Sequence, residues 1–256
     1  MRRIARVALP EQTARYLNAK QSAVEADTEI DKLWKQQRRS ASMRPVEAAL
    51  RRMAGPRERC MYCEDSRGTD IEHFWPRVPY RERLFLWPNL LWSCAGCNRC
   101  KTKNFPLTES GAPLLIDPTS EDPWDHLFYD EQTHEITPRW DPNTGLENPK
   151  GEETLAALPT LRYQAVTEGR GRTQRNLKRA VASFLESKIE DEEEALAELW
   201  RCLTDNDGYG LLVWYFLRDG RHEQPFAGFR GRKPAAWAEI ARRVSQTSAP
   251  STAPSV

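Results

Sequence analysis

The chain has 256 residues, of which 39% are hydrophobic and 29% are charged, enough apolar sequence to bury a core in one large or two small domains. The N-terminus has arginines but lacks an apolar stretch of the length that a signal peptide needs, and the longest apolar run, Gly210–Leu217, is too short to cross a bilayer. We therefore expect a folded, cytoplasmic protein without membrane contact.

The charges are divided unevenly along the chain. Residues 1–107 have 21 lysines and arginines against 12 acidic residues, a net charge of +9, whereas residues 108–256 have 17 against 25, a net charge of −8. A basic half suits a polyanionic substrate, and an acidic half suits a protein partner or plain solvation. Segregation by chance is the alternative.

Residues 1–55 are predicted to form a basic helical region. Helices are expected at Glu11–Lys20, at about Glu25–Arg39, and after Ser42, which is a plausible N-cap with Pro45 in the first turn. Gly55 then ends the third helix. The arginines of this region that could hold nucleic-acid phosphates are Arg38, Arg39, Arg44, Arg51 and Arg52.

Two C-x2-C pairs, Cys60 with Cys63 and Cys94 with Cys97, are separated by 30 residues. Two such pairs can present four thiolates to a tetrahedral Zn(II) and leave no open position for chemistry, which makes the predicted zinc structural. Six cysteines in a cytoplasmic chain argue against a disulfide framework. Cys100 could in principle replace Cys97, but the spacing favours Cys97 and leaves Cys100 as a spare thiol.

The segment 56–107, which contains both cysteine pairs, is predicted to be the core of the protein. Ile71, His73 and Trp75 alternate as in a strand, and Leu90–Ser93 form a second strand that leads into a short helix at the second cysteine pair. The expected order is strand, loop, strand, helix.

Residues 108–150 are dense in proline, aspartate and aromatic side chains, which predicts a loop-rich extension. A hairpin is expected where Leu127–Tyr129 pairs with Glu135–Thr137 across a polar turn.

Residues 151–245 are predicted to be helical and to dock a partner, and residues 246–256 to be disordered. A continuous apolar stripe predicts a long helix over Thr173–Leu203, and the acidic run Glu190–Glu194 on it is either a docking surface or a solvated face. A helix or strand at Leu211–Leu217, a loop through Phe229–Gly231 and a last helix at Pro234–Val244 complete the region.

The segment between the cysteine pairs resembles the HNH nuclease family. The matching positions are Glu72-His73 on the first strand, Asn89 before the second strand, Asn98 on the helix and Lys101 one turn later. The resemblance implies an α+β fold, mainly helical, around a zinc-stapled ββα-metal core. It also implies that Asn89 braces the loop behind the histidine.

Phosphodiester hydrolysis needs an activated water and a cation that neutralises charge on the phosphate. His73 can accept the proton of water at neutral pH. Glu72 and Asn98 offer oxygen ligands for Mg(II) or Mn(II), and Lys101, with Lys103 nearby, would contact phosphate. Adjacent strand residues face opposite sides, so Glu72 and His73 share a site only where the strand twists or ends. The commoner family residue at the position of Glu72 is aspartate. The longer glutamate could shift the metal or bind it through water, and Asp70 is the alternative ligand.

A narrower resemblance extends over about residues 1–130, to the PtuB family of HNH proteins in the Septu anti-phage defence system, including retron-associated versions. It rests on the opening M-R-R-I, on I-E-H-F-x-P, on N-L-L-W-S-C-x-x-C-N, on F-P-L at Phe105–Leu107 and on I-D-P at Ile116–Pro118. The resemblance implies a partner ATPase of the ABC/SMC-like PtuA type and, in retron versions, a reverse transcriptase with its RNA–DNA product.

Two classes of function remain open at this point. The chain is either a nuclease, with DNA as the favoured target and tRNA or other RNA as the alternative, or a zinc-dependent adaptor that recruits other proteins without cutting. The adaptor would use Glu72, His73 and Asn98 as ordinary polar residues. The ordered set of acidic residue, histidine, two asparagines and lysine beside a basic flank favours the nuclease.

Overall fold

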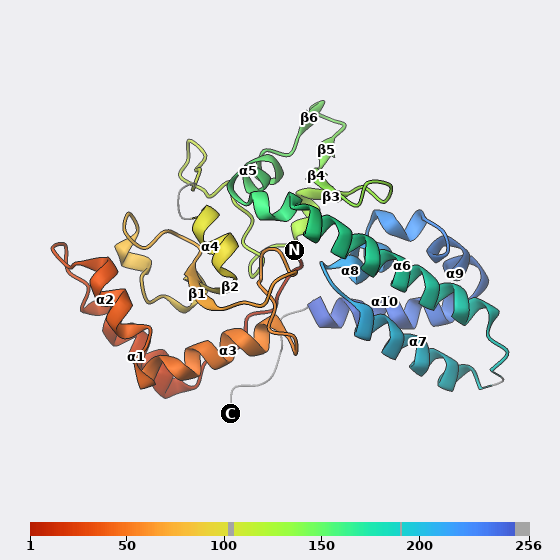
Figure 1. Ribbon diagram of the computed structural model, residues 1–256, viewed down its shortest axis with the longest axis horizontal. Coiled ribbons are helices and arrows are strands. Elements are labelled where there is room, and N and C mark those ends of the chain that lie inside the picture. The colour runs from red at the N-terminus through yellow and green to blue at the C-terminus, as the bar shows by residue number, and fades with distance from the viewer. Residues whose placement is uncertain (102–104, 190, 249–256) are drawn as a thin grey trace.

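The computed structural model describes residues 1–101, 105–189 and 191–248, and in these residues the fold is mainly helical with small antiparallel strand pairs. Its N-terminal elements are α1 (Glu11–Ser22), α2 (Ile30–Gln37), α3 (Arg44–Ala54), β1 (Asp70–His73), β2 (Leu90–Ser93) and α4 (Ala95–Lys101). These are followed by β3 (Leu127–Tyr129), β4 (Ile136–Pro138), β5 (Trp140–Asp141), β6 (Leu146–Glu147), α5 (Pro149–Ala157), α6 (Gln164–Glu186), α7 (Glu192–Asn206), α8 (Leu211–Leu217), α9 (Phe226–Arg232) and α10 (Pro234–Ser248). In Figure 1, α1–α4 occupy one side of the molecule and α6–α10 the other.

The N-terminal helices follow the predicted order with two differences. Helix α3 buries its apolar face as expected, and Gly55 ends it at φ +87°, a left-handed backbone that glycine adopts readily. Ser42 is not its N-cap, because a short 3-10 helix over Ala41–Met43 leads directly into Arg44. Helix α2 starts at Ile30 rather than Glu25, since the Thr28 hydroxyl accepts a hydrogen bond from the Glu25 backbone N–H and closes a turn there.

Strands β1 and β2 form an antiparallel pair that α4 follows directly. Asp70 pairs with Ser93 and His73 with Leu90, so β1 ends at His73. The order strand, loop, strand, helix is the one that the sequence predicts. Helix α3 contacts β2, and α4 contacts β1. The loop between the strands lies beside α1 and α2, because Gln21 donates to the Arg81 carbonyl and Arg77 pairs with Asp31 (Figure 1).

The predicted hairpin forms, with its second strand moved by one residue. Leu127 pairs with Pro138 and Tyr129 with Ile136. The shift arises in the turn, where the Asp130 carboxylate accepts hydrogen bonds from the backbone of Gln132 and Thr133.

Helix α6 begins nine residues before the predicted start and passes through two glycines. A Cβ at Gly169 would lie 2.0 Å from the Tyr209 hydroxyl, and one at Gly171 would lie 2.5 Å from the His134 ring. These glycines therefore permit close packing of α6 against neighbouring segments. Their low helix propensity explains why the sequence pattern did not show the first turns of this helix.

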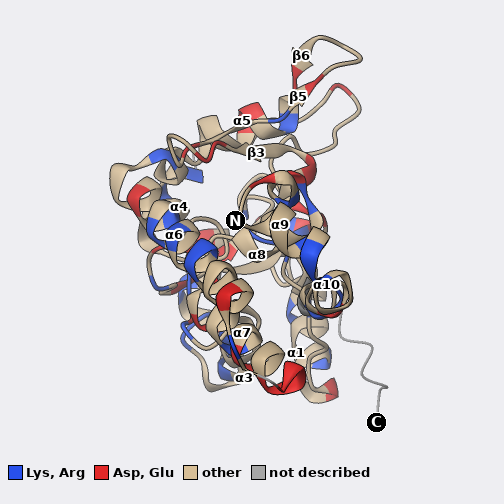
Figure 2. Ribbon diagram, turned by 90° about the vertical axis from the view of Figure 1, so that its right-hand side faces the viewer, with Lys and Arg blue, Asp and Glu red and all other residues tan. Residues whose placement is uncertain are grey.

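The predicted long helix is two helices, α6 and α7, which pack against each other. Asp191 is the N-cap of α7 because its carboxylate accepts hydrogen bonds from the backbone of Glu193 and Glu194. Of the acidic run, Glu192, Glu193 and Glu194 therefore lie in the first turn of α7, where the helix dipole favours them, and Glu190 lies outside the described residues. Figure 2 shows this acidic turn at the near lower end of the molecule.

The last helices also differ from the prediction. Phe226 and Phe229 are buried on helix α9, where a loop was expected, because their spacing places both on one face. Helix α10 continues past Val244 to Ser248, into the segment predicted to be disordered, and residues 249–256 lie outside the described part of the chain. None of the described helices has both the length and the apolarity to cross a membrane.

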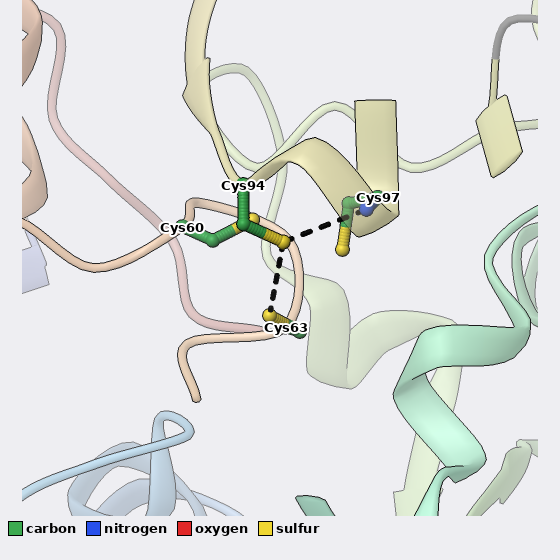
Figure 3. Close-up of side chains that lie close together, drawn as sticks. All are labelled: Cys60, Cys63, Cys94 and Cys97. Atoms are coloured by element: carbon green, nitrogen blue, oxygen red, sulfur yellow. Dashed lines mark hydrogen bonds between the residues drawn. The ribbon is translucent and has the colours of Figure 1, made fainter. Parts of the chain in front are cut away.

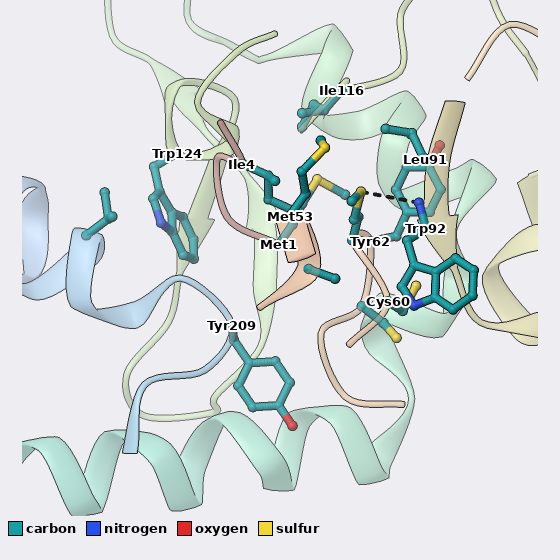
Figure 4. Packing of buried hydrophobic residues seen from close by; sticks show 14 of the residues in the cluster. Met1, Ile4, Met53, Cys60, Tyr62, Leu91, Trp92, Ile116, Trp124 and Tyr209 are labelled. Atoms are coloured by element: carbon teal, nitrogen blue, oxygen red, sulfur yellow. Dashed lines mark hydrogen bonds between the residues drawn. The ribbon is translucent and has the colours of Figure 1, made fainter. Parts of the chain in front are cut away.

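The apolar core joins the two sides of the molecule. Figure 4 shows Met1 and Ile4 between Trp124 on one side and Tyr62 and Trp92 on the other, and all of them are buried members of one cluster that also includes Tyr209. A continuous core implies that the helices after α5 stabilise the cysteine segment.

Gly169 offers a test of that packing. We expect Gly169→Ala to lower the free energy of unfolding by about 1–3 kcal/mol, since the new methyl group overlaps the buried Tyr209 hydroxyl. Gly231→Ala is the matched control: its Cβ meets open space on α9, and a gain of about 0.4–1 kcal/mol is expected. Urea denaturation of both variants checks this, and equal effects would contradict close packing at Gly169.

Candidate functional site

Four cysteine sulfurs meet beside the β1–β2 pair. The first cysteine turn is attached to β2 because the Met61 backbone N–H donates to the Trp92 carbonyl at 2.8 Å. The second follows β2 directly and runs into α4. Cys60, Cys63, Cys94 and Cys97 are buried, and their sulfur atoms all lie within 4.8 Å of one another (Figure 3).

The cluster has the dimensions of a zinc site. A Zn–S bond of about 2.3 Å in a tetrahedron gives sulfur separations of about 3.8 Å, and the sulfurs of Cys63 and Cys94 are 3.9 Å apart. Burial raises the pKa of the Cys60 thiol, and a bound cation would stabilise its thiolate form. The four cysteines could hold a zinc ion, and four protein ligands close its coordination shell.

Cys100 lies outside the four-cysteine cluster. A threonine from a later segment of the chain lies beside the cluster. The Cys97 sulfur is 3.1 Å from the Thr160 hydroxyl, which comes from the short helix Pro159–Arg162 after α5. A hydroxyl near a sulfur ligand orients it and stabilises its charge. The segment after α5 therefore completes the surroundings of the cluster.

His73 lies at the end of β1 with its side chain held from two sides. Its Nε2 is 2.9 Å from the Leu84 carbonyl oxygen, and its ring meets the edge of Trp34 at a centroid distance of 4.3 Å. Since a carbonyl only accepts, Nε2 carries the proton and Nδ1 has the lone pair. Nδ1 is buried and has no hydrogen-bond partner among the described residues.

Burial controls the charge state of this imidazole. His73 is 2% exposed, and burial lowers its pKa to about 3. The ring is therefore neutral at neutral pH, with an unshared electron pair on Nδ1, and burial disfavours protonation of that atom in the present arrangement.

Glu72 and Lys101 form a buried ion pair beside His73. The Lys101 ammonium lies 2.9 Å from a Glu72 carboxylate oxygen and donates to the His73 carbonyl at 2.5 Å. Lys101 is 1% exposed, and burial lowers its pKa while it raises that of Glu72. The sequence predicts Lys101 as a phosphate contact, whereas the structure places its charge on Glu72.

A pocket of about 160 Å³ opens at these residues. Its lining residues are Asp31, Glu72, His73, Pro76, Arg77, Val78, Pro79 and Lys101. Glu72 and His73 share it because β1 ends at His73. Asn98 lies half-buried on α4 and is not part of that lining, so its joint role with Glu72 as a metal ligand stays a prediction.

Asn89 connects both ends of the loop that covers His73. Its side-chain oxygen accepts from the Trp75 backbone N–H at 2.6 Å, and its amide donates to the carbonyls of Trp75 and Arg83. These contacts brace the loop, as the family resemblance implies, and they leave the asparagine away from the pocket lining.

The predicted basic residues do not form one uniform surface. Arg38 is paired with Asp70, the reserve metal ligand, and Arg51 is paired with Glu47 and Glu58. Arg39, Arg44 and Arg52 are exposed, and Lys103 lies outside the described residues.

Four residues around His73 were not anticipated from the sequence. Leu84 supplies the carbonyl that holds the ring, Trp34 packs on it, and Asp31 and Arg77 line the pocket. Only Arg77, four residues after His73 and next to a proline, could have been noticed. The others come from segments whose approach depends on tertiary packing.

Loss of one zinc ligand should unfold the segment. A closed zinc site contributes on the order of 10 kcal/mol in small domains, so Cys94→Ser is expected to lose the zinc and to melt at a markedly lower temperature. Zinc content by mass spectrometry and thermal unfolding measure this. Cys202→Ser, on α7 and outside the four-cysteine cluster, is the control and should keep one zinc per chain; a zinc-free wild type would contradict the assignment.

The Glu72–Lys101 pair should be strongly coupled. Breaking a buried pair costs about 3–5 kcal/mol, so Glu72→Gln and Lys101→Met are each expected to lower stability by that amount. The double variant should recover most of the loss because neither charge is left unpaired. A double-mutant cycle by denaturant unfolding measures the coupling, and additive losses would show that the pair is not formed.

Comparison with known proteins finds one relative and no matching family. No family model matches the chain. Over 87 residues the chain is 32% identical to the Septu protein PtuB of Bacillus thuringiensis, a match that covers 32% of this chain and 32% of that protein. The chain thus spans about a third of the length of the curated relative that it matches. The similarity relates this chain to the Septu proteins.

Proposed function

We propose that this chain is a metal-dependent nuclease of the HNH type that acts as the effector of a Septu-type defence complex, with DNA as its favoured substrate. The observation that carries the proposal is the orientation of His73. Its Nε2 is engaged by the Leu84 carbonyl, which leaves Nδ1 as the basic atom, and the pocket beside it also has a carboxylate and a lysine. The similarity to the Septu protein PtuB supports the defence role.

In the proposed reaction His73 acts as general base. Its Nδ1 takes a proton from water, the water oxygen attacks the phosphorus, and the bond from phosphorus to the leaving oxygen breaks. The hydrogen bond from Nε2 to Leu84 holds the ring as positive charge develops on it. Asn89 keeps the loop that carries Leu84 in place.

Glu72 fits the ligand chemistry of a hard divalent cation, because it places a carboxylate at the pocket. When bound, Mg(II) or Mn(II) would stabilise negative charge on the phosphate and on the leaving oxygen. Lys101 neutralises Glu72 in the present arrangement and would give up that contact to the ion. Asn98 remains the proposed second ligand.

The proposed complex contains an ATPase of the PtuA type and, in retron-linked systems, a reverse transcriptase with its RNA–DNA product. The acidic first turn of α7 is a suitable part of the docking surface, since Glu192, Glu193 and Glu194 are exposed there. The exposed arginines of α3 would hold phosphates of the substrate.

His73→Ala tests the nuclease against the adaptor. We expect cleavage to fall by about 10²–10⁴-fold, while zinc content and complex formation are retained. The assay incubates the purified chain, with and without its genomic neighbour, with plasmid, single-stranded DNA and tRNA in Mg(II), Mn(II) or EDTA. His222→Ala, an exposed histidine, is the control.

Each outcome of that assay has a defined meaning. Unchanged cleavage by His73→Ala would overturn the mechanism. Absence of cleavage by the wild type on every substrate, together with intact complex formation, would support the adaptor. Cleavage of tRNA alone would replace DNA with RNA as the substrate.

A further inference from the structure

A phosphate in the pocket at His73 needs a cation to bind it, and in the resting arrangement the charge of Lys101 is already paired with Glu72. Its ammonium is sealed from solvent and already contacts both Glu72 and the His73 carbonyl. We infer that Arg77 binds the substrate phosphate in this pocket and that Asp31 on α2 holds its guanidinium in the resting state. This inference rests on the proposed function and assigns a residue that the family resemblance did not.

Arg77 is placed at the mouth of the pocket. It follows Pro76 shortly after β1, lines the pocket with Glu72 and His73, and is 31% exposed. A phosphate bound in this pocket beside His73 is therefore within the part of the site that Arg77 lines.

The guanidinium of Arg77 has N–H donors that the contact with Asp31 does not use. Its Nε donates to the Asp31 carboxylate at 2.6 Å, and its two terminal nitrogens make no hydrogen bond to any residue in the described part of the chain. Arginine presents its donors in a planar fork that matches two phosphate oxygens. A phosphate can consequently bind Arg77 without rearrangement of the backbone.

Asp31 competes with that phosphate. It lies on α2 three residues before Trp34, which packs on His73, so one face of α2 contacts both the base and the arginine. The Asp31 carboxylate is 67% exposed, and an exposed ion pair of this kind is weak. Asp31 can therefore hold Arg77 in the absence of substrate and yield to a phosphate.

Binding to a fluorescein-labelled DNA duplex, measured by anisotropy in the full-length His73→Ala background, tests the inference without cleavage. We expect Arg77→Gln to weaken binding about tenfold and to reduce the slope of log affinity against log salt by about one. Arg77→Lys should recover part of the affinity. Asp31→Asn should tighten binding a few-fold, because it releases the arginine.

Lys32→Gln is the matched control, since it removes one positive charge next to Asp31 on α2 but is 82% exposed and paired with Glu29. If Arg77→Gln behaves like Lys32→Gln, or if Asp31→Asn weakens binding, the inference is wrong. The result is separable from the proposed function. If cleavage is lost in His73→Ala but unchanged in Arg77→Gln, only the role of Arg77 is overturned. If the wild type cleaves no substrate, the nuclease proposal is overturned, and the binding assay still tests Arg77.

Discussion

The convergence of four cysteine sulfurs from two turns is the constraint on which the rest of this structure depends. The turns lie 30 residues apart in the chain, and the segment between them contains β1, the loop over His73 and β2. Holding the ends of that segment together removes most of the freedom of the loop. The hydrogen bonds of Asn89 and the packing of Trp34 on His73 then fix the conformation of this closed loop at a smaller cost in conformational entropy.

The C-terminal helices are part of that arrangement and not a separate appendage. Tyr209 donates a hydrogen bond to Asp65 beside the first cysteine turn, Arg57 donates to the Asp205 carbonyl, and Thr160 lies against Cys97. These contacts join α7, the chain leading to α8, and the segment after α5 to the cysteine cluster. The C-terminal end of α7 is therefore connected through packed structure to the cysteine segment.

Local patterns in the sequence predicted the features that depend on few neighbours. The C-x2-C spacing predicts which cysteines meet, and the alternation at Ile71 and His73 predicts β1. What the sequence did not reveal depends on tertiary packing. Lys101 looks like a surface cation, yet the rings of Phe74 and Phe105 surround its ammonium. Glycines 169 and 171 look like helix breakers, although the closeness of Tyr209 and His134 makes them necessary in α6.

The buried pair of Glu72 and Lys101 has a consequence for how a nuclease could be kept harmless in the cell that makes it. The Glu72 carboxylate is already neutralised by the Lys101 ammonium. A divalent cation that binds Glu72 therefore has to displace the lysine. The free energy of the Glu72–Lys101 interaction therefore weakens the binding of a divalent cation to Glu72 by the same amount. Under the proposed function, a divalent cation alone would bind the resting chain weakly. The negative charge of a bound phosphate would then favour replacement of Lys101 by the cation at Glu72.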